Sequence, residues 1–333
     1  MALMGLPNEM LQLVGSFLVE EADIYAFILT HSRMYGLLID QLYRNAVQRK
    51  DPRRPAVLFW ASANNRLETA RKALTSGADI NEITNEGYTA LWVAADKGHT
   101  EIVRLLLAVP EVDVTIESHL GYCRWNALHI ACWKQRLGAI KLMLDSDKFD
   151  ANAHCSTGGT PLQKACQNGH AKTVRALLAS GKVRLTHQPL NEHDPSRSPF
   201  DAAVYKGNAK IAHMLLDAGL DLTGNNADGS TPLHIAAIKP VMSSVVKRLI
   251  AEEGVEVNVR NAKGETPLHK ACAGLFSGNE EIVQILLAMP GIDSDVRTTD
   301  GKTPLDYALA SGEADIERLL SAFKAKRRRV RYQ

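Results

Sequence analysis

The chain repeats one pattern of apolar and polar positions eight times between residues 55 and 323. In each copy an apolar residue stands two positions after a small start residue, which is polar in every copy but the first, and small residues follow at the fifth or sixth position, as in Leu91 and Ala94 after Thr89. The eight starts are Ala56, Thr89, Asn126, Thr160, Ser198, Thr231, Thr266 and Thr303. Because these starts are spaced 33, 37, 34, 38, 33, 35 and 37 residues apart, the sequence indicates a repeat architecture.

Each copy predicts two helices. The first is short and begins at the polar start, where a Thr side chain can accept from orphan amides and Pro fits the first turn. Glycines such as Gly98, Gly169 and Gly207 then supply the left-handed residue that ends it. The second helix carries a wider apolar stripe at helical spacing, for example Ile102, Val103, Leu105 and Leu106. A turn closing on a pair such as Asp228 and Gly229 leads into the next copy.

The Thr-Pro-Leu-His run at this period resembles the ankyrin repeat family, over roughly four-fifths of the chain. The resemblance implies an all-α fold, an ankyrin-repeat solenoid of helix-turn-helix units with short β-turn fingers. We expect it to span residues 55–323, preceded by a small three-helix module at 1–50 and followed by a basic tail at 324–333. A solenoid offers a long face of turn tips and first helices for protein partners.

The histidines His129, His234 and His269 occupy one position of the repeat. A catalytic group would not copy itself in successive units, so a structural role is favoured over an active site. In the ankyrin family the recurring imidazole and threonine hydroxyl hydrogen-bond each other and neighbouring turns, and the resemblance implies the same here.

Nothing in the sequence assembles an enzyme, a cofactor site or a metal site. Cys132, Cys166 and Cys272 share a repeat position and are expected in the core, while Cys123 and Cys155 fall in turns without a Cys-x-x-Cys partner. Gly301-Lys-Thr lacks the earlier glycine of a phosphate-binding loop, because position 296 is Val. We therefore expect a non-enzymatic interaction protein without a cofactor.

Departures from the repeat mark candidate partner-binding residues. Tyr122, Arg124 and Trp125 crowd the finger that enters the third repeat, a composition typical of interface hot spots. Leu275 and Phe276 lie in an insertion between the helices of the seventh repeat. The alternatives are unconstrained loops, or an aromatic side chain packed between repeats.

The first fifty residues follow a different pattern, with apolar faces on three short predicted helices. Leu6, Pro7 and Met10, followed by Phe17 and Leu18 and further apolar residues, resemble an F-box. Members of that family bind a Skp-type adaptor and so join a cullin-RING ubiquitin ligase. The resemblance implies an adaptor face that includes Leu6, Pro7 and Met10 within residues 6–47. The alternative is a helical cap for the exposed end of the stack.

Charge and cysteine content bear on location. Five cysteines, widely separated and odd in number, favour a reduced intracellular protein, and the first residues predict neither a signal peptide nor a membrane span. Of the 39 basic residues, six fall between positions 324 and 331, which leaves 33 against 37 acidic residues and a net charge of −4 elsewhere. That balance argues against a specific nucleic-acid reader.

The basic run itself resembles a nuclear import signal, with a solvated tail as the alternative. Its residues are Lys324, Lys326, Arg327, Arg328, Arg329 and Arg331. We expect the run to follow the last helix and to direct the chain to the nucleus, with a cytoplasmic pool as a further possibility.

Two functions compete at this stage. In the first, the chain is a substrate receptor of a cullin-RING ubiquitin ligase that captures its target through the repeats. In the second, it is a nuclear coregulator that binds a transcription factor through the same face. In either case we expect a monomer within a larger complex, with protein partners.

Overall fold

The structure is a computed structural model of the chain. It describes residues 57–84, 86–118, 124–156, 158–185, 198–222, 224–273 and 278–331, with the backbone alone over 328–331. The predicted F-box-like module at 1–50, with Leu6, Pro7 and Met10, lies outside the described residues.

Every regular element in the described ranges is a helix, which confirms the all-α fold. The first helices of the repeats are α4 (Val57–Ala63), α6 (Ala90–Lys97), α8 (Ala127–Trp133), α10 (Pro161–Gln167), α12 (Pro199–Tyr205), α14 (Pro232–Ala236), α16 (Pro267–Cys272) and α18 (Pro304–Ser311). The second helices are α5 (Leu67–Thr75), α7 (Thr100–Leu107), α9 (Leu137–Asp145), α11 (Ala171–Ala179), α13 (Ala209–Asp217), α15 (Ser243–Leu249), α17 (Glu280–Leu287) and α19 (Ala314–Arg331), and a 3₁₀ turn η2 (Pro240–Met242) precedes α15. None of these helices is long and apolar enough to cross a membrane.

The predicted helix starts are confirmed at atomic detail. The N-cap residues of the first helices from α6 onward are Thr89, Asn126, Thr160, Ser198, Thr231, Thr266 and Thr303. The Thr89 hydroxyl accepts from the Trp92 amide at 3.1 Å, and the Ser198 hydroxyl accepts from Asp201 at 3.0 Å. Since an N-cap side chain satisfies amides that have no partner inside the helix, these residues fix where each repeat begins.

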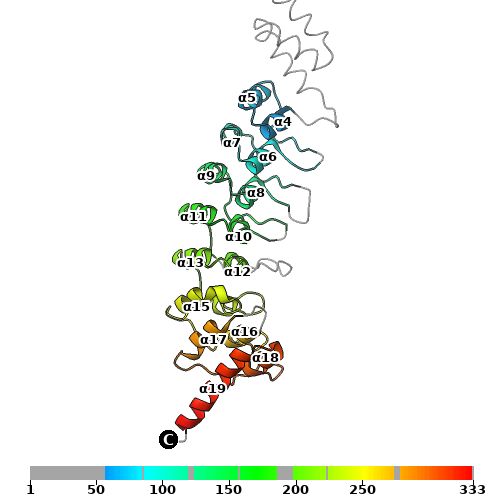
Figure 1. The fold of residues 1–333 in the computed structure, drawn as a ribbon. Helices are drawn as coiled ribbons and strands as arrows, with labels where there is room; N and C mark the ends of the chain where they lie inside the picture. The colour runs from blue at the N-terminus through cyan, green and yellow to red at the C-terminus, as the bar shows by residue number, and fades with distance from the viewer. Residues whose placement is uncertain are drawn as a thin grey trace, which may run out of the picture. The chain divides into compact units, whose positions relative to one another are not determined.

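The chain divides into two compact units, Met1–Phe149 and Asp150–Gln333. In the described part of the first unit, α6 packs against α4 and α8, and α7 packs against α5 and α9 (Figure 1). In the second unit the first helices α10 to α18 contact their successors in order, and so do the second helices α11 to α19. Each unit is therefore a stack of helix pairs, as the repeat pattern predicts.

Small residues let the first helices approach one another. Ala94, Ala131 and Ala165 are fully buried, and so are Cys132, Cys166 and Cys272. The cysteines are thus core residues, as expected. Burial raises the pKa of the Cys166 thiol and raises that of Cys272 to about 12, so both remain protonated at neutral pH.

The loops between repeats are tied to one another by hydrogen bonds. In the first unit the Asn81 side chain donates to the Glu111 carbonyl and accepts from the Asp113 amide, both at 2.8 Å. Asn258 does the same in the second unit, with Gly291 and Asp293, at 2.9 Å. These bonds fix the spacing of neighbouring repeats on the side of the second helices.

The end of the last helix differs from the prediction. The sequence pattern placed Lys324–Arg331 after the helix, whereas α19 continues through Arg331. No Gly or Pro interrupts the segment, and Ala, Lys and Arg favour helix. Two contacts also hold this part of α19 to the preceding loop: Lys324 Nζ lies 2.7 Å from an Asp295 oxygen, and Arg327 donates to the Ile292 carbonyl at 2.9 Å.

Candidate functional site

Two of the recurring histidines, His234 and His269, link their repeat to the next. In α14 the His234 Nδ1 accepts from the Thr231 amide at 3.1 Å, and its Nε2 lies 3.0 Å from the Glu265 carbonyl of the next repeat. His269 makes the equivalent contacts with Thr266 and Lys302. The structural role predicted for His234 and His269 is therefore confirmed. His129 is also fully buried, with its Nδ1 2.7 Å from the side-chain oxygen of its N-cap Asn126.

This geometry requires a neutral imidazole. A carbonyl oxygen only accepts, so Nε2 of His234 carries the proton and Nδ1 must stay bare to accept from the amide. Burial lowers the pKa of His234 to about 4 and also lowers that of His269. Both rings are therefore neutral at physiological pH.

Trp92 takes the histidine position in the second repeat. Like His234 it stands three residues after its N-cap Thr, and its amide donates to the Thr89 hydroxyl at 3.1 Å. Its indole Nε1 donates to the Trp125 carbonyl at 2.9 Å, the residue directly before the next N-cap. Trp92 thus makes the bond between repeats that histidine makes elsewhere, and it adds a large aromatic surface.

Aromatic side chains continue from Trp92 along the first helices of the first unit. The Tyr88 ring stacks on Trp92 with centroids 4.2 Å apart and an interplanar angle of 24°. Trp125 packs against Trp133, the last residue of α8, at 5.2 Å and 52°. All four side chains are half-buried. We call Tyr88, Trp92, Trp125 and Trp133 the aromatic face.

Two exposed apolar residues accompany this face. Trp60, on α4, which packs against α6, is 42% exposed, and Ile83 in the finger before α6 is 45% exposed. Exposed Trp and Tyr side chains are typical of the energetic centres of protein interfaces. The first unit therefore presents apolar and aromatic surface on its finger and first-helix side.

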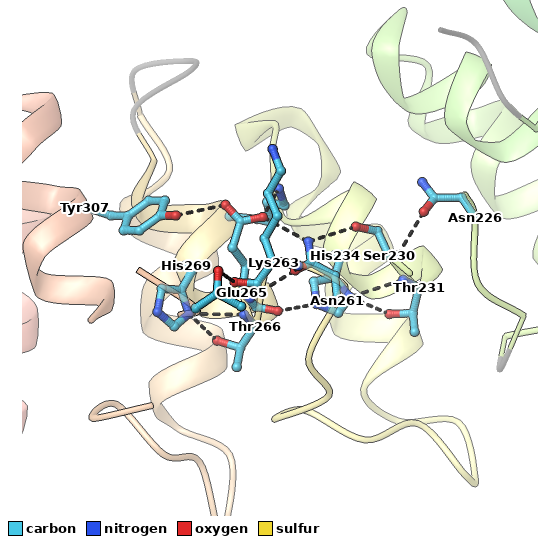
Figure 2. A network of polar contacts seen from close by, with 12 residues as sticks. Asn226, Ser230, Thr231, His234, Asn261, Lys263, Glu265, Thr266, His269 and Tyr307 are labelled. Carbon is cyan, nitrogen blue, oxygen red and sulfur yellow. Dashed lines mark hydrogen bonds and ion pairs between the residues drawn. The ribbon is translucent and has the colours of Figure 1, made fainter. Parts of the chain in front are cut away.

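In the last three repeats, which belong to the second unit, the equivalent positions are polar (Figure 2). Ser230, Glu265 and Lys302 stand directly before their N-caps, where the first unit has Tyr88 and Trp125. The Glu265 carboxylate accepts from Lys270 Nζ at 2.5 Å, from Asn261 at 2.9 Å and from the Tyr307 hydroxyl at 3.0 Å. Asn261 also donates to the Ser230 hydroxyl at 3.2 Å. These bonds connect the sixth, seventh and eighth repeats.

Electrostatics stabilise this polar network. Burial alone would raise the pKa of Glu265, but hydrogen bonds from Lys270, Asn261 and Tyr307 outweigh it and lower the pKa to about 2. Burial and the bond to the Glu265 carboxylate raise the pKa of Tyr307 to about 12. Because its polar groups hydrogen-bond one another, we assign this network a structural role, which is to hold the last three repeats together.

The predicted partner-binding residues lie in different surroundings. Arg124 is exposed at the entry to the third repeat, and Trp125 beside it is half-buried against Trp133. Tyr122, Leu275 and Phe276 lie outside the described residues.

Sequence reasoning missed Trp60, Tyr88 and Trp92. A signal was available, because all four tryptophans of the chain fall between positions 60 and 133. Comparing residues at equal repeat positions would have shown Trp92 in the place of a structural histidine.

The predicted import residues belong to α19. Lys326 is exposed, whereas Lys324 and Arg327 contact Asp295 and Ile292. The Arg327 guanidinium also lies 5.7 Å from the centre of the Phe323 ring. Arg328, Arg329 and Arg331 continue the helix, but their side chains lie outside the described part.

Among the side chains that the structure describes, no group of three or more His, Cys, Asp or Glu residues is placed to hold a metal ion. The exposed apolar and aromatic residues of the first unit suit contact with another macromolecule.

Relatives of this chain share the repeat region. It is 25% identical over 200 residues to a transient receptor potential cation channel subfamily A member 1 homologue of Caenorhabditis elegans, covering 60% of this chain and 16% of that protein. It is 27% identical over 186 residues to the ankyrin repeat protein YahD of Escherichia coli, covering 55% of this chain and 89% of that protein. The chain thus spans about a sixth of the length of the worm protein.

A solved structure has the same fold. The ankyrin repeat domain of Bcl-3 matches 70% of this chain and 98% of that domain with a TM-score of 0.60, at 22% identity. The family model for ankyrin repeats in three copies matches residues 31–118, 58–155, 110–188 and 233–328, and its first match begins inside the segment that resembles an F-box. These matches cover well over half of the sequence, and the chain belongs to the ankyrin repeat family.

Proposed function

We propose that this ankyrin repeat protein holds a protein partner on the aromatic face of its first unit. Ankyrin repeats serve protein–protein interaction. The observation that carries the assignment is a difference in residue type at equivalent positions of different repeats. They are aromatic at Tyr88, Trp92 and Trp125, but polar and bonded to one another around Glu265.

The stacking at this face supports binding because the two rings are held in place and yet remain partly exposed to solvent. The indole bond to the Trp125 carbonyl fixes the orientation of Trp92, and Tyr88 covers only part of it. A side chain ordered in advance loses little conformational freedom when a partner binds. Stacked aromatic residues therefore contribute area at a small entropic cost.

The test exchanges residue types between repeats. Replacing Tyr88→Ser and Trp92→His installs the residues that the sixth repeat has at the same positions, Ser230 and His234. Histidine can keep the bond to the next repeat, so the variant removes aromatic surface while retaining the link. We expect affinity capture from cells to lose the partners that the wild-type chain recovers, while thermal unfolding shows that the variant remains folded. Recovery of the same partners by the variant would overturn the assignment.

A more specific role of this protein, within a ubiquitin ligase, depends on residues 6–47. We propose that they bind a Skp-type adaptor, so that the chain is a substrate receptor of a cullin-RING ubiquitin ligase. The support is the F-box resemblance of Leu6, Pro7 and Met10 together with a repeat region suited to capture a target.

Capture from cells tests the adaptor role separately. Wild-type chain should recover a Skp-type adaptor and a cullin, and Leu6→Ala with Pro7→Ala should lose both while keeping the partners of the aromatic face. Absence of the adaptor from wild-type captures, or its recovery by the double variant, would exclude the receptor role.

A nuclear coregulator that binds a transcription factor is the second candidate, favoured by the basic end of α19. Under this proposal Arg327→Ala, Arg328→Ala and Arg329→Ala together move the chain out of the nucleus, and wild-type captures contain transcription machinery in place of adaptor and cullin. An unchanged cellular distribution would remove the import signal from the proposal.

A further inference from the structure

We infer that the partner of the aromatic face is a basic segment that places an arginine or lysine side chain against the Tyr88–Trp92 pair. The inference rests on the proposed protein-binding role of this face and names the chemistry of its occupant. It follows from the charges around the pair and from the orientation of the two rings.

Carboxylates surround the pair. The described finger residues 82–84 and 86–88 include Glu82 and Glu86, both exposed, and no Lys or Arg. Asp96 stands one helical turn after Trp92 on α6, so the two side chains share a face of the helix. Besides burial, the charges of Glu86 and Asp96 raise the pKa of the Tyr88 hydroxyl, which places both carboxylates within electrostatic reach of the ring.

Two bases of the chain lie beside Asp96, one near its carboxylate and one bonded to its backbone. Lys97 Nζ lies 3.9 Å from the Asp96 carboxylate and is mostly exposed, and Arg136 donates to the Asp96 backbone carbonyl at 2.7 Å. In the second unit, by contrast, Lys270 lies 2.5 Å from the carboxylate of Glu265. The finger beside the Tyr88–Trp92 pair thus carries the exposed carboxylates Glu82 and Glu86, and a cation from outside the chain matches them.

The rings themselves favour the same occupant. The face of an indole or phenol ring attracts Arg and Lys cations, Trp most strongly. Both rings are half-buried, and the Nε1 bond of Trp92 holds its ring in place. Glu86 can pair with the same cation, while exposed Ile83 nearby in the finger suits an apolar neighbour in the partner. Aromatic rings with carboxylates beside them thus select a basic segment over an acidic one.

The probe is a short fluorescein-labelled peptide of alternating arginine and glycine, compared with its glutamate counterpart by anisotropy on the full-length chain. We expect the arginine peptide to bind, with quenching of tryptophan fluorescence and weakening at high salt, and the glutamate peptide not to bind. Equal binding of both peptides, or binding of neither, would overturn the inference.

Two variants localise the binding. Glu86→Gln removes one exposed carboxylate, and we expect a dissociation constant about threefold higher, as for loss of an exposed ion pair. Trp92→His should raise it about fivefold, the loss of one cation–π contact. Glu101→Gln on α7 is the matched control, since Glu101 is an exposed carboxylate of the same repeat and pairs with Arg104 at 3.3 Å. An equal effect of Glu101→Gln would mean that peptide binding depends only on the net charge of the chain, which contradicts the inference.

The inference and the proposed function fail in different ways. If Tyr88→Ser with Trp92→His abolishes capture of cellular partners but the arginine peptide does not bind, the face binds proteins and the cationic occupant is wrong. If neither partner capture nor peptide binding responds to that variant, the face itself is wrong.

Discussion

At the scale of residues, the third position of the first helix joins neighbouring repeats at Trp92, His234 and His269. His234 and His269 fill it with a neutral imidazole that accepts from its own N-cap amide and donates to the next repeat. Trp92 makes the same donation through an indole. One structural role is thus carried by two side chains that differ in the surface they offer to partners.

Exchange at this position tests the equivalence. Trp92→His should change the free energy of unfolding by less than about 1 kcal/mol, because the bond to the Trp125 carbonyl can be kept. Trp92→Ala should cost about 3 kcal/mol, since it removes both the bond and the packed ring. Urea denaturation of both variants measures the difference. Equal losses would show that the ring packing, and not the hydrogen bond, holds the second repeat.

The histidines also predict a pH dependence. The pKa of His234 is about 4 in the folded chain and near 6.5 when unfolded, so below about pH 6.5 the unfolded chain binds a proton that the folded chain does not. Stability therefore falls as pH falls, by about 2 kcal/mol between pH 7 and pH 5 for this residue alone. Denaturation midpoints across that range should flatten in a His234→Asn variant. A wild-type midpoint independent of pH would contradict the neutral, buried ring.

At the scale of elements, the sequence predicted helix starts well because each depends on local chemistry. Thr, Ser or Asn followed by Pro and Leu specifies an N-cap and a first turn without reference to the rest of the fold. The end of α19 could not be predicted in this way. It depends on contacts of Lys324 and Arg327 with the loop before α18, and Arg327 and Ile292 are 35 residues apart in sequence. A basic run is equally compatible with a solvated tail.

The network around Glu265 joins elements of three repeats, and a double-mutant cycle measures it. Glu265→Gln and Tyr307→Phe should each destabilise the chain, and the double variant should lose about 1 kcal/mol less than their sum. Glu256→Gln, an exposed carboxylate of the same loop, is the control. Strict additivity would show that the Tyr307 hydroxyl and Glu265 do not stabilise each other.

Finger turns offer a second test at this scale. Gly264 and Gly301 both have positive φ, +70° and +75°, but a Cβ at Gly264 would lie 2.6 Å from an Arg260 nitrogen and 3.1 Å from the Thr299 amide nitrogen, while Gly301 is open. We expect Gly301→Ala to cost about 1 kcal/mol for the backbone conformation alone. Gly264→Ala should cost clearly more in thermal unfolding. Equal costs would indicate that neighbouring fingers can move apart without loss.

At the scale of the whole molecule, the repeat period predicts the fold but does not predict where a partner binds. The stack follows from copies that resemble each other, whereas Tyr88 and Trp92 matter because they depart from the copies around them. Arg124 and Trp125 are predictable from the sequence because they lie side by side with Tyr122 in one short segment. Comparison of repeat positions can single out Trp92, but only the structure shows that its ring stacks on Tyr88, with centroids 4.2 Å apart. Partner chemistry then follows from the carboxylates around the pair.

Amide hydrogen exchange on the chain, alone and in complex with a partner recovered from cells, tests the central claim most directly. The account predicts slower exchange on binding at residues 82–97 and 124–133, which include the aromatic face, and unchanged exchange on the second helices α5, α7 and α9. Protection confined to those second helices or to the second unit would contradict it.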